Sequence, residues 1–441
     1  MKTICLAYGR SSLSVRVPDG AQVLRGPHAP PLDRPEEAVM KALAEPIGSP
    51  PLAELVRRQR PTSVAITVSD ITRPVPNPVL LKGLLDVLNR NGVSDAQVLV
   101  VIGTGMHRES TPQERRQIVG DDVLARVEVI DHRPRDAAAL VQISSEPPVA
   151  VNRRFAEADF RIVTGLIEPH FMAGFSGGRK GVCPALADLQ TVQRFHGFRT
   201  LADPRADAGV LEGNPCHQIA LSVARTVGVD FLVNVAITHE REVAGVFAGD
   251  LVAAHEAGCR KVARWVAAEI DGPFDLVVTS GGGYPLDQTF YQTVKGMVMA
   301  LPALGPTSTL LQASHCGEGI GSQAYADLIL GYDNQWQRFL ADAEAAADRT
   351  LLDQWEYQMQ TRVLQRIGIE RLHLVCDGIP ADTVRRLSAT PVCGPGDAAA
   401  RLQAAIDGHL AAHGQARVAV IPEGPYTLLL QRGARPHGQA M

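Results

Sequence analysis

The stretch RIVTGLIEPHFMAGFSGGRK, residues 161–180, decides the fold expected for this chain. Its first part, 161–166, is a short apolar run rich in β-branched residues, which is typical of a buried strand. Glu168-Pro169-His170 and a glycine-rich turn ending at Lys180 follow at once. Residues able to carry out chemistry therefore lie just beyond the carboxyl end of a strand, where open α/β sheets bind their ligands.

Further runs of the same kind occur along the chain, and stretches with helical spacing of apolar residues lie between them. The predicted strands are 63–68, 97–102, 127–130, 161–166, 231–236, 276–279, 309–313, 372–376 and 418–421. The predicted helices are 33–45, 80–89, 216–227, 251–269, 324–348 and 398–413. Strands that alternate with helices in this way form parallel sheets covered by helices. We therefore expect the α/β fold class, with mainly parallel sheets.

The length of 441 residues suggests two or three domains, at roughly 100 to 200 residues per domain. The best break lies at Asp271-Gly272-Pro273, where a long Ala-rich helix stops and a new strand begins. We expect an N-terminal α/β domain of residues 1–270 and a smaller C-terminal α/β domain of residues 271–441. The final residues, 435–441, are expected to fray.

Composition excludes several classes of protein. The 43 Lys and Arg residues nearly balance the 47 Asp and Glu residues, and no basic stripe with interleaved aromatics occurs, so we expect no nucleic-acid partner. The seven cysteines are scattered, which argues against a disulfide framework and a zinc ribbon. No run of about 18 apolar residues and no signal-peptide pattern occurs, so we expect a cytoplasmic protein with no membrane partner.

The glycine-rich turn combines several groups that suit a phosphorylated or metal-bearing cofactor. Glycine has no Cβ, so Ser176-Gly177-Gly178 lets backbone N–H groups approach an anion closely. Arg179 adds a positive charge that suits phosphate and disfavours a second cation on Lys180, whose amine could then be partly neutral and nucleophilic. The alternative is a phosphate loop with an ordinary lysine. The glycine-rich turn is not a Walker A loop, because Gly181, and not Ser or Thr, follows the lysine.

Two earlier strand ends also carry reactive side chains. The segment from Asp70 to Arg73 could grip a substrate carboxylate through its guanidinium, or could be an ion pair in a Pro-rich turn. His107 follows the next strand, either as a general base or as a loop histidine without a task. Two imidazoles, His107 and His170, could face each other across a small substrate. Acid/base groups on opposite faces of one carbon are what an epimerisation requires.

A second glycine-rich strand end, Ser280 to Gly283, opens the expected C-terminal domain. Gln292 and Lys295 follow it, three residues apart on one helical face. An amide and an ammonium on that face could complete a carboxylate site begun by Arg73. They could equally be ordinary polar surface.

Six motifs in register resemble the nickel-dependent lactate racemase family. They are Asp70-x-Thr72-Arg73-Pro74, Gly103-Thr-Gly-Met-His107-Arg108, Glu168-Pro-His170 through Gly177-Gly-Arg-Lys180, His196, Tyr291-Gln292-x-x-Lys295, and Trp355. The resemblance runs from about residue 63 to residue 355 and so covers most of the chain. It implies two α/β domains with the active site in the cleft between them.

The resemblance also implies a cofactor, the nickel-pincer nucleotide. This pyridinium-derived mononucleotide holds Ni through carbon and sulfur, and one of its arms is joined to a lysine, whose position is occupied by Lys180. His196 matches the residue that completes nickel coordination. Asp70 and Thr72 match the loop beside the cofactor, to which the anion-binding turn at 176–178 would be added.

The remaining matches concern the substrate, a small 2-hydroxy acid. His107 and His170 match the acid/base pair. The expected substrate-binding residues are Arg73, Tyr291, Gln292, Lys295 and Trp355. One difference is local: Pro184 is followed by Ala185, where members of the family usually have Gly.

The function implied is racemisation or epimerisation at C2 of a 2-hydroxy acid, with cofactor-biosynthesis proteins as further partners. Two alternatives come from other classes. A lysine-dependent pyridoxal-phosphate enzyme would use Lys180 beside a phosphate loop but leave His196 and the paired histidines without tasks. A non-catalytic receptor for a phosphorylated metabolite would explain the loops but need no reactive amine.

Overall fold

The chain folds into two α/β units, which the computed structural model describes over residues 1–433. The segment 435–441, expected to fray, lies outside the described residues. The first unit contains His28–Phe195 and Val210–Trp265. The second contains Met1–Pro27, His196–Gly209 and the described residues from Val266 onward. The chain thus changes units near residue 266, close to the break expected at 271.

The units differ from the expected domains, 1–270 and 271–441, in their discontinuity. Strand β3 (Gln22–Val23) pairs in parallel with β19 (Val418–Ile421), which adds the start of the chain to the second unit's sheet. The hairpin of β1 (Lys2–Tyr8) and β2 (Ser11–Val17) packs its apolar side chains into the core of the same unit. A boundary read from local composition cannot reveal pairing between segments so far apart.

The first unit is built on a six-stranded sheet with the strand order β13-β12-β9-β4-β5-β6. Its strands are β4 (Val64–Ser69), β5 (Val98–Gly103), β6 (Glu128–Asp131), β9 (Phe160–Leu166), β12 (Phe231–Ile237) and β13 (Val243–Gly249). All neighbours pair in parallel except β12 and β13. Two small hairpins accompany the sheet: β7 (Leu140–Ser145) with β8 (Pro148–Asn152), and β10 (Pro169–His170) with β11 (Gly174–Phe175).

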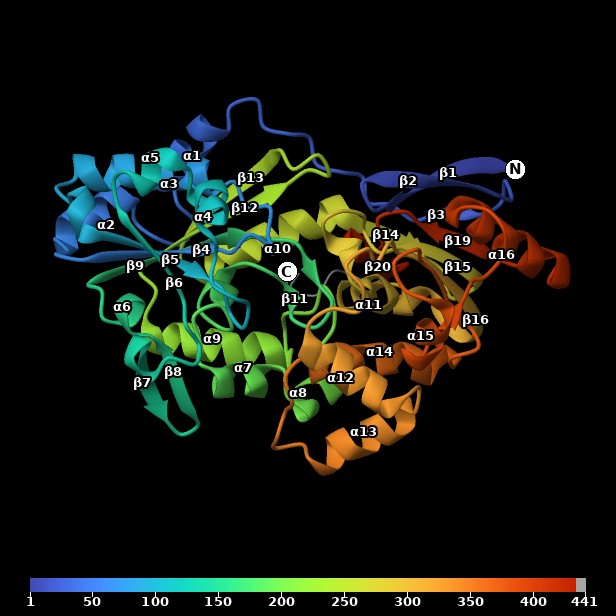
Figure 1. Ribbon diagram of the computed structural model, residues 1–441. Helices are drawn as coiled ribbons and strands as arrows, with labels where there is room; N and C mark the ends of the chain where they lie inside the picture. The colour runs from blue at the N-terminus through green and yellow to red at the C-terminus, as the bar shows by residue number, and fades with distance from the viewer. Residues whose placement is uncertain (434–441) are drawn as a thin grey trace. The chain divides into compact units, whose positions relative to one another are not determined.

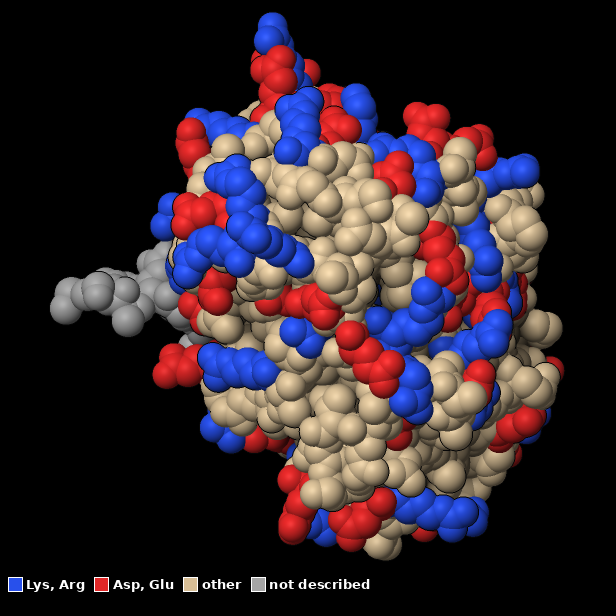
Figure 2. Space-filling model, turned by 90° about the vertical axis from the view of Figure 1, so that its left-hand side faces the viewer, with Lys and Arg blue, Asp and Glu red and all other residues tan. Residues whose placement is uncertain are grey.

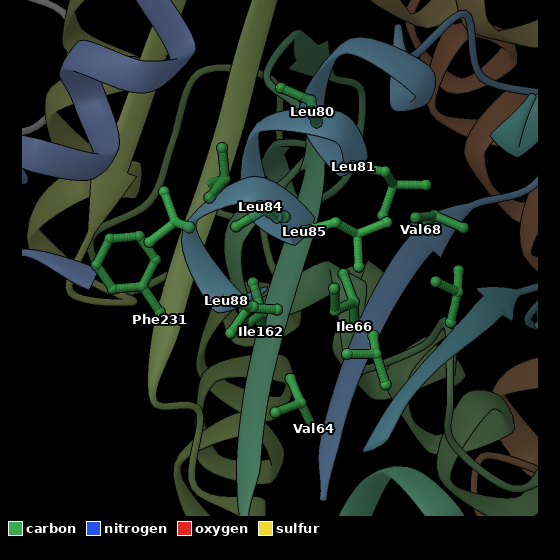
Figure 3. Close-up of a cluster of buried hydrophobic side chains, with 14 of the residues drawn as sticks. Val64, Ile66, Val68, Leu80, Leu81, Leu84, Leu85, Leu88, Ile162 and Phe231 are labelled. Atoms are coloured by element: carbon green, nitrogen blue, oxygen red, sulfur yellow. The ribbon is translucent and has the colours of Figure 1, made fainter. Parts of the chain in front are cut away.

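Helices cover both faces of this sheet (Figure 1). They are α1 (Pro35–Ala44), α2 (Leu52–Gln59), α3 (Asn77–Arg90), α4 (Pro112–Val119), α5 (Asp121–Leu124), α6 (Arg153–Ala156), α7 (Leu189–Phe195), α9 (Pro215–Val227) and α10 (Ala253–Val266). Single 3-10 turns are η1 (Asp95–Gln97), η2 (Ala137–Ala139) and η3 (Gly178–Gly181). On one face, α3 presents Leu81, Leu84 and Leu88 at helical spacing to the strands (Figure 3). Burial of these leucines stabilises the sheet. The candidate site lies at the carboxyl ends of its strands.

The second unit contains a six-stranded sheet that is parallel throughout, with the order β18-β17-β16-β15-β19-β3. Besides β3 and β19, its strands are β15 (Phe274–Ser280), β16 (Leu304–Ala313), β17 (Leu372–Val375) and β18 (Thr390–Pro391). A separate parallel pair joins β14 (Ala267–Ile270) to β20 (Leu428–Gln431). Together the two sheets confirm the expected α/β class with mainly parallel strands.

Helices and 3-10 turns accompany the sheets of the second unit. The helices are α8 (Phe198–Ala202), α11 (Phe290–Met299), α12 (Gln323–Tyr332), α13 (Trp336–Ala345), α14 (Gln354–Ile367), α15 (Ala381–Arg386) and α16 (Ala398–Ala412), with 3-10 turns η4 (Leu286–Gln288), η5 (Leu301–Ala303) and η6 (Gly424–Tyr426). The predicted helix 324–348 is two helices, because Asp333 and Asn334 take left-handed φ values of 43° and 61° between them. The predicted helix 251–269 ends at Val266, since β14 pairs with β20.

The surface charges, the cysteines and the helices relate to the expectations drawn from composition. On the face shown in Figure 2, basic and acidic side chains are interspersed. No disulfide is recorded among residues 1–433. Within residues 1–433, no helix combines the length and the apolar character needed to cross a membrane.

Candidate active site

The candidate site of the first unit lies at the carboxyl ends of three adjacent parallel strands. Strand β4 pairs with β5 on one side and with β9 on the other. Asp70 follows β4, His107 lies in the loop after β5, and Glu168 follows β9. Because parallel strands end at the same edge of a sheet, three segments distant in sequence meet there. The strand β4 lies between those that carry His107 and His170.

Asp70 anchors His107. The Asp70 carboxylate Oδ2 lies 2.6 Å from His107 Nδ1, and its Oδ1 accepts from the Thr72 hydroxyl at 2.6 Å. Burial alone would raise the pKa of Asp70, but the hydrogen bonds from His107 and Thr72 and the charge of Arg73 outweigh it and lower the pKa. An ionised Asp70 accepts the Nδ1 proton, so we assign His107 the tautomer with Nε2 unprotonated. The imidazole is 57% exposed and its Nε2 is able to act as a base.

The Arg73 side chain lies beside Glu168, which comes shortly after strand β9. Its Nη1 donates to Glu168 Oε1 at 3.3 Å, and both side chains are partly buried. One interpretation of the sequence was an ion pair between Asp70 and Arg73. In the structure, Arg73 forms its ion pair with Glu168. This contact fixes the guanidinium near the strand ends that carry His107 and His170.

His170 and Lys180 are neighbours. Their nitrogens Nε2 and Nζ are 2.9 Å apart, and Nδ1 of the same ring accepts from the backbone N–H groups of Met172 at 3.4 Å and Ala173 at 3.2 Å. With Nδ1 as an acceptor, a neutral His170 carries its proton on Nε2. An Nε2–H donor finds an acceptor in Lys180 only when the amine is uncharged. Only an uncharged amine is nucleophilic, so the tautomer of His170 bears on the proposed role of Lys180.

The glycine turn packs against the protein interior. Gly177 and Gly178 have φ values of 72° and 56°, which glycine adopts without strain. The Gly178 N–H donates to Asn234 Oδ1 at 2.7 Å, and the Ser176 hydroxyl donates to the carbonyl of Leu166 at 2.7 Å. These groups therefore already have partners within the chain, and their contact with a cofactor anion stays a prediction.

Arg179 does not extend toward a phosphate as the sequence suggested. Its side chain is 1% exposed, and it donates to the carbonyls of Ala173 at 2.6 Å and Gly177 at 3.4 Å. Its Nη1 also lies 3.0 Å from His255 Nε2 on α10. Burial lowers the pKa of Arg179 to about 10. The guanidinium therefore stabilises the turn from its buried side.

Ala185 keeps an ordinary backbone, since it is not among the residues with positive φ. Its carbonyl accepts from the Gly105 N–H at 3.0 Å. Alanine therefore fits where the family usually has glycine, and it helps to hold the loop that carries His107.

The other predicted residues lie in the second unit. The His196 and Trp355 rings stack with centroids 4.5 Å apart, and Trp355 Nε1 donates to the Tyr291 hydroxyl at 2.8 Å. Gln292 and Lys295 lie on α11, where Thr289 caps the helix by accepting from the Gln292 N–H. The Gln292 side-chain oxygen is buried without a hydrogen-bond partner among residues 1–433. Such an atom is suited to receive a donor from a ligand.

In the part of the chain that the structure describes, no group of three or more His, Cys, Asp and Glu side chains is arranged to hold a metal ion. His196 instead has an aromatic neighbour, Trp355. Its role as a nickel ligand stays a prediction.

Sequence reasoning missed three residues that shape the site. Glu168 was given no role from the sequence, although a carboxylate just beyond a strand is a candidate ion-pair partner for Arg73. Asn234 is an amide inside the apolar run of β12, and His255 lies on the buried face of α10; both are almost fully buried. Polar residues in apolar patterns are the signal that could have found them.

Comparison with known protein families decides the family. A family model of the lactate racemase N-terminal domain matches residues 8–209, and a model of the lactate racemase C-terminal domain matches residues 270–428. The chain belongs to the lactate racemase family. The resemblance inferred from the six motifs is thereby confirmed, and the family is one of isomerases.

Members of the lactate racemase family from two bacteria are similar over most of their length. The lactate racemase of Thermoanaerobacterium thermosaccharolyticum is 31% identical over 440 residues, 98% of this chain and 100% of that protein. The lactate racemase of Lactiplantibacillus plantarum is 34% identical over 395 residues, 88% of this chain and 89% of that protein.

Solved structures agree on the fold. The lactate racemase apoprotein from T. thermosaccharolyticum has a TM-score of 0.87 and 31% identity, and the match covers 97% of this chain and 100% of that one. A protein from Thermotoga maritima has a TM-score of 0.67 at 19% identity, covering 92% of this chain and 100% of that one, which is a likeness of fold alone.

Proposed function

We propose that this chain is a racemase or epimerase that inverts C2 of a 2-hydroxy acid and carries a nickel-pincer nucleotide joined to Lys180. Membership in the lactate racemase family supports the reaction class, and lactate is the first substrate to test. The observation that carries the proposal is the pair of imidazoles at the strand ends. Asp70 Oδ2 holds the His107 ring at Nδ1, and the backbone N–H of Ala173 faces Nδ1 of His170, so both imidazoles are held through Nδ1.

The side chains present fit the proposed cofactor. Joining an arm of the nucleotide to the chain requires a nucleophilic amine, and Lys180 supplies an amine 2.9 Å from the His170 imidazole. A pincer ligand brings its own carbon and sulfur donors, so the protein has to supply few further ligands, and the imidazole of His196 is a suitable one. When bound, the nucleotide supplies an electrophilic carbon beside nickel that takes up and returns a hydride.

The chain's own residues would handle binding and protons. Arg73 and Lys295 bind the substrate carboxylate, and Gln292, Tyr291 and Trp355 help to orient it. One histidine accepts the hydroxyl proton as C2 becomes planar. The other donates a proton to the oxygen after the group has turned its opposite face. Such an exchange needs one imidazole with an unprotonated nitrogen and the other as an imidazolium, so the two histidines exchange roles when the direction of the reaction is reversed.

The test is a panel of enantiopure 2-hydroxy acids incubated with cofactor-loaded protein, with loss of optical rotation as the readout. The panel comprises lactate, malate, aryl-lactates, longer aliphatic hydroxy acids and gluconate. We expect at least one to racemise or epimerise. Protein made without the cofactor-building enzymes should be inactive, and a loaded protein inactive on the whole panel would contradict the proposal.

Histidine variants test the acid/base roles separately. His107→Ala and His170→Ala should each lower the turnover by about 100-fold or more, which is the usual contribution of a positioned acid or base. Intact mass should show that the adduct on Lys180 is kept in both variants. Normal turnover in either variant would refute the two-base assignment.

A further inference from the structure

Arg179 is buried without a counter-charge. It is the largest of the fully buried side chains, and no carboxylate among residues 1–433 forms an ion pair with it. Its donors go to the carbonyls of Ala173 and Gly177, and its Nε has no partner among the described residues. Burying an unpaired cation costs free energy that hydrogen bonds have to offset. We therefore expect this side chain to have a role beyond packing.

The backbone that Arg179 grips is the backbone that contacts His170. Ala173 accepts from Arg179 Nη2 through its carbonyl at 2.6 Å and donates from its N–H to His170 Nδ1 at 3.2 Å. The N–H of Met172 points to the same ring nitrogen at 3.4 Å. Fixing residue 173 through its carbonyl therefore also fixes the direction of the N–H groups that face the imidazole.

A second support comes from α10. His255 Nε2 lies 3.0 Å from Arg179 Nη1 and 2.9 Å from the carbonyl oxygen of Ser176. A Cβ on Gly178 would lie 2.5 Å from Cγ of the His255 ring, so the turn and the helix are in close contact. The segment between His170 and Lys180 is thus held at Ala173, at Gly177 and against α10.

We propose that Arg179 is a positioning residue that sets the tautomer of His170. By orienting Ala173 it keeps Nδ1 as an acceptor, so the ring proton stays on Nε2 and meets the Lys180 amine. This inference rests on the proposed roles of His170 and Lys180. It adds that the arginine preceding the lysine prepares both residues for their tasks from inside the turn.

The first test uses the unaltered full-length chain without cofactor. Selective ¹⁵N labelling of histidine distinguishes protonated from unprotonated ring nitrogens by NMR, and His170→Gln identifies the signals of His170. We expect a neutral ring with its proton on Nε2. A proton on Nδ1 would overturn the inference, and this result does not depend on any variant folding.

The second test compares Arg179→Met, which keeps the bulk without donors, with Arg179→Lys, which keeps a charge and a donor. In the methionine variant the His170 tautomer ratio should shift by about fivefold to tenfold toward Nδ1–H, as expected for loss of about one hydrogen bond. Reductive methylation of Lys180, quantified by peptide mass spectrometry, should slow by a similar factor. The lysine variant should restore part of both effects.

The matched control is Arg161→Lys. Arg161 donates to the Ala156 carbonyl and contacts Asp230 near the amino end of β9, opposite the candidate site. This variant should leave the tautomer and the methylation rate unchanged. An unchanged tautomer in Arg179→Met would overturn the positioning role. Because both readouts need neither cofactor nor substrate, failure of the proposed racemisation would leave them unaffected and would be recognised separately.

Discussion

At the scale of single residues, the site depends on which ring nitrogen carries a proton. Asp70 is buried and accepts from His107 and Thr72, so it orients the imidazole and fixes which ring nitrogen carries the proton. Removing the carboxylate charge would allow the ring to turn or change tautomer. The aspartate therefore acts through the histidine.

Asp70→Asn should lower the turnover by about 100-fold or more with a smaller change in KM, because base strength is lost and substrate contacts remain. Chiral chromatography of both enantiomers measures the rate. The matched control is Asp95→Asn, which removes a carboxylate paired with Arg126 just before β5 begins, at the other end of that strand. Equal rates for Asp70→Asn and the unaltered enzyme would contradict the role of Asp70.

The places of the predicted residues relative to the strands were easier to predict than their contacts. The sequence placed Asp70, His107 and His170 after apolar runs that form strands, and Lys180 at the end of the glycine turn that follows the third of these runs. It did not predict that Arg179 points inward. The partners that hold it, Ala173 and His255, are joined by folding and leave no local pattern.

At the scale of elements, the glycine turn at 176–178 packs closely against α10. Gly178 has a φ of 56°, and a Cβ there would lie 2.5 Å from the His255 ring. Gly92 has a φ of 94°, but nothing lies within 4 Å of its Cβ position. Comparing substitutions at the two glycines therefore separates the cost of a left-handed backbone from the cost of steric overlap.

Gly92→Ala should lower the free energy of unfolding by about 1 kcal/mol, from the left-handed backbone alone. Gly178→Ala should lower it by about 3 kcal/mol, because the ring or the turn must also shift. Chemical denaturation measures both values. Equal losses in the two variants would show that His255 does not constrain the turn.

His132, just after β6, gives the fold a dependence on pH. Its Nε2 lies 3.0 Å from the Ala187 carbonyl, and burial lowers its pKa from 6.5 to about 4. The unfolded chain therefore takes up a proton near pH 6.5 and the folded chain only near pH 4. Stability should fall as the pH drops through this window, by up to about 3 kcal/mol from this residue.

His132→Gln should reduce the slope of unfolding free energy against pH between 6.5 and 4. Part of the slope should remain, because burial also lowers the pKa values of His217 and His255. Denaturant titrations at several pH values provide the measurement. An unchanged slope in the variant would refute the assignment to His132.

The strands of the main sheets could be predicted because buried parallel strands read as apolar runs, whereas the helix α14 was not predicted. All nine predicted strands correspond to strands of the two main sheets. The hairpins, such as β7 with β8, were missed because their strands are only partly buried and lack a continuous apolar run. The break at Asp333 and Asn334 was missed because helical spacing continues across it.

At the scale of the whole molecule, the chain assembles two mainly parallel sheets from discontinuous segments. Length and composition predicted two α/β parts, but not that residues 1–27 and 196–209 belong with the C-terminal part. Family membership extends over both parts. The proposed chemistry nevertheless depends on a single amine, Lys180, to carry the cofactor.

The most direct measurement is the intact mass and nickel content of protein produced together with the cofactor-building enzymes, followed by peptide mapping. We expect one sulfur-containing nucleotide on Lys180 with about one nickel per chain, and neither in Lys180→Ala. Protein that racemises its substrate with Lys180 unmodified would contradict the central claim.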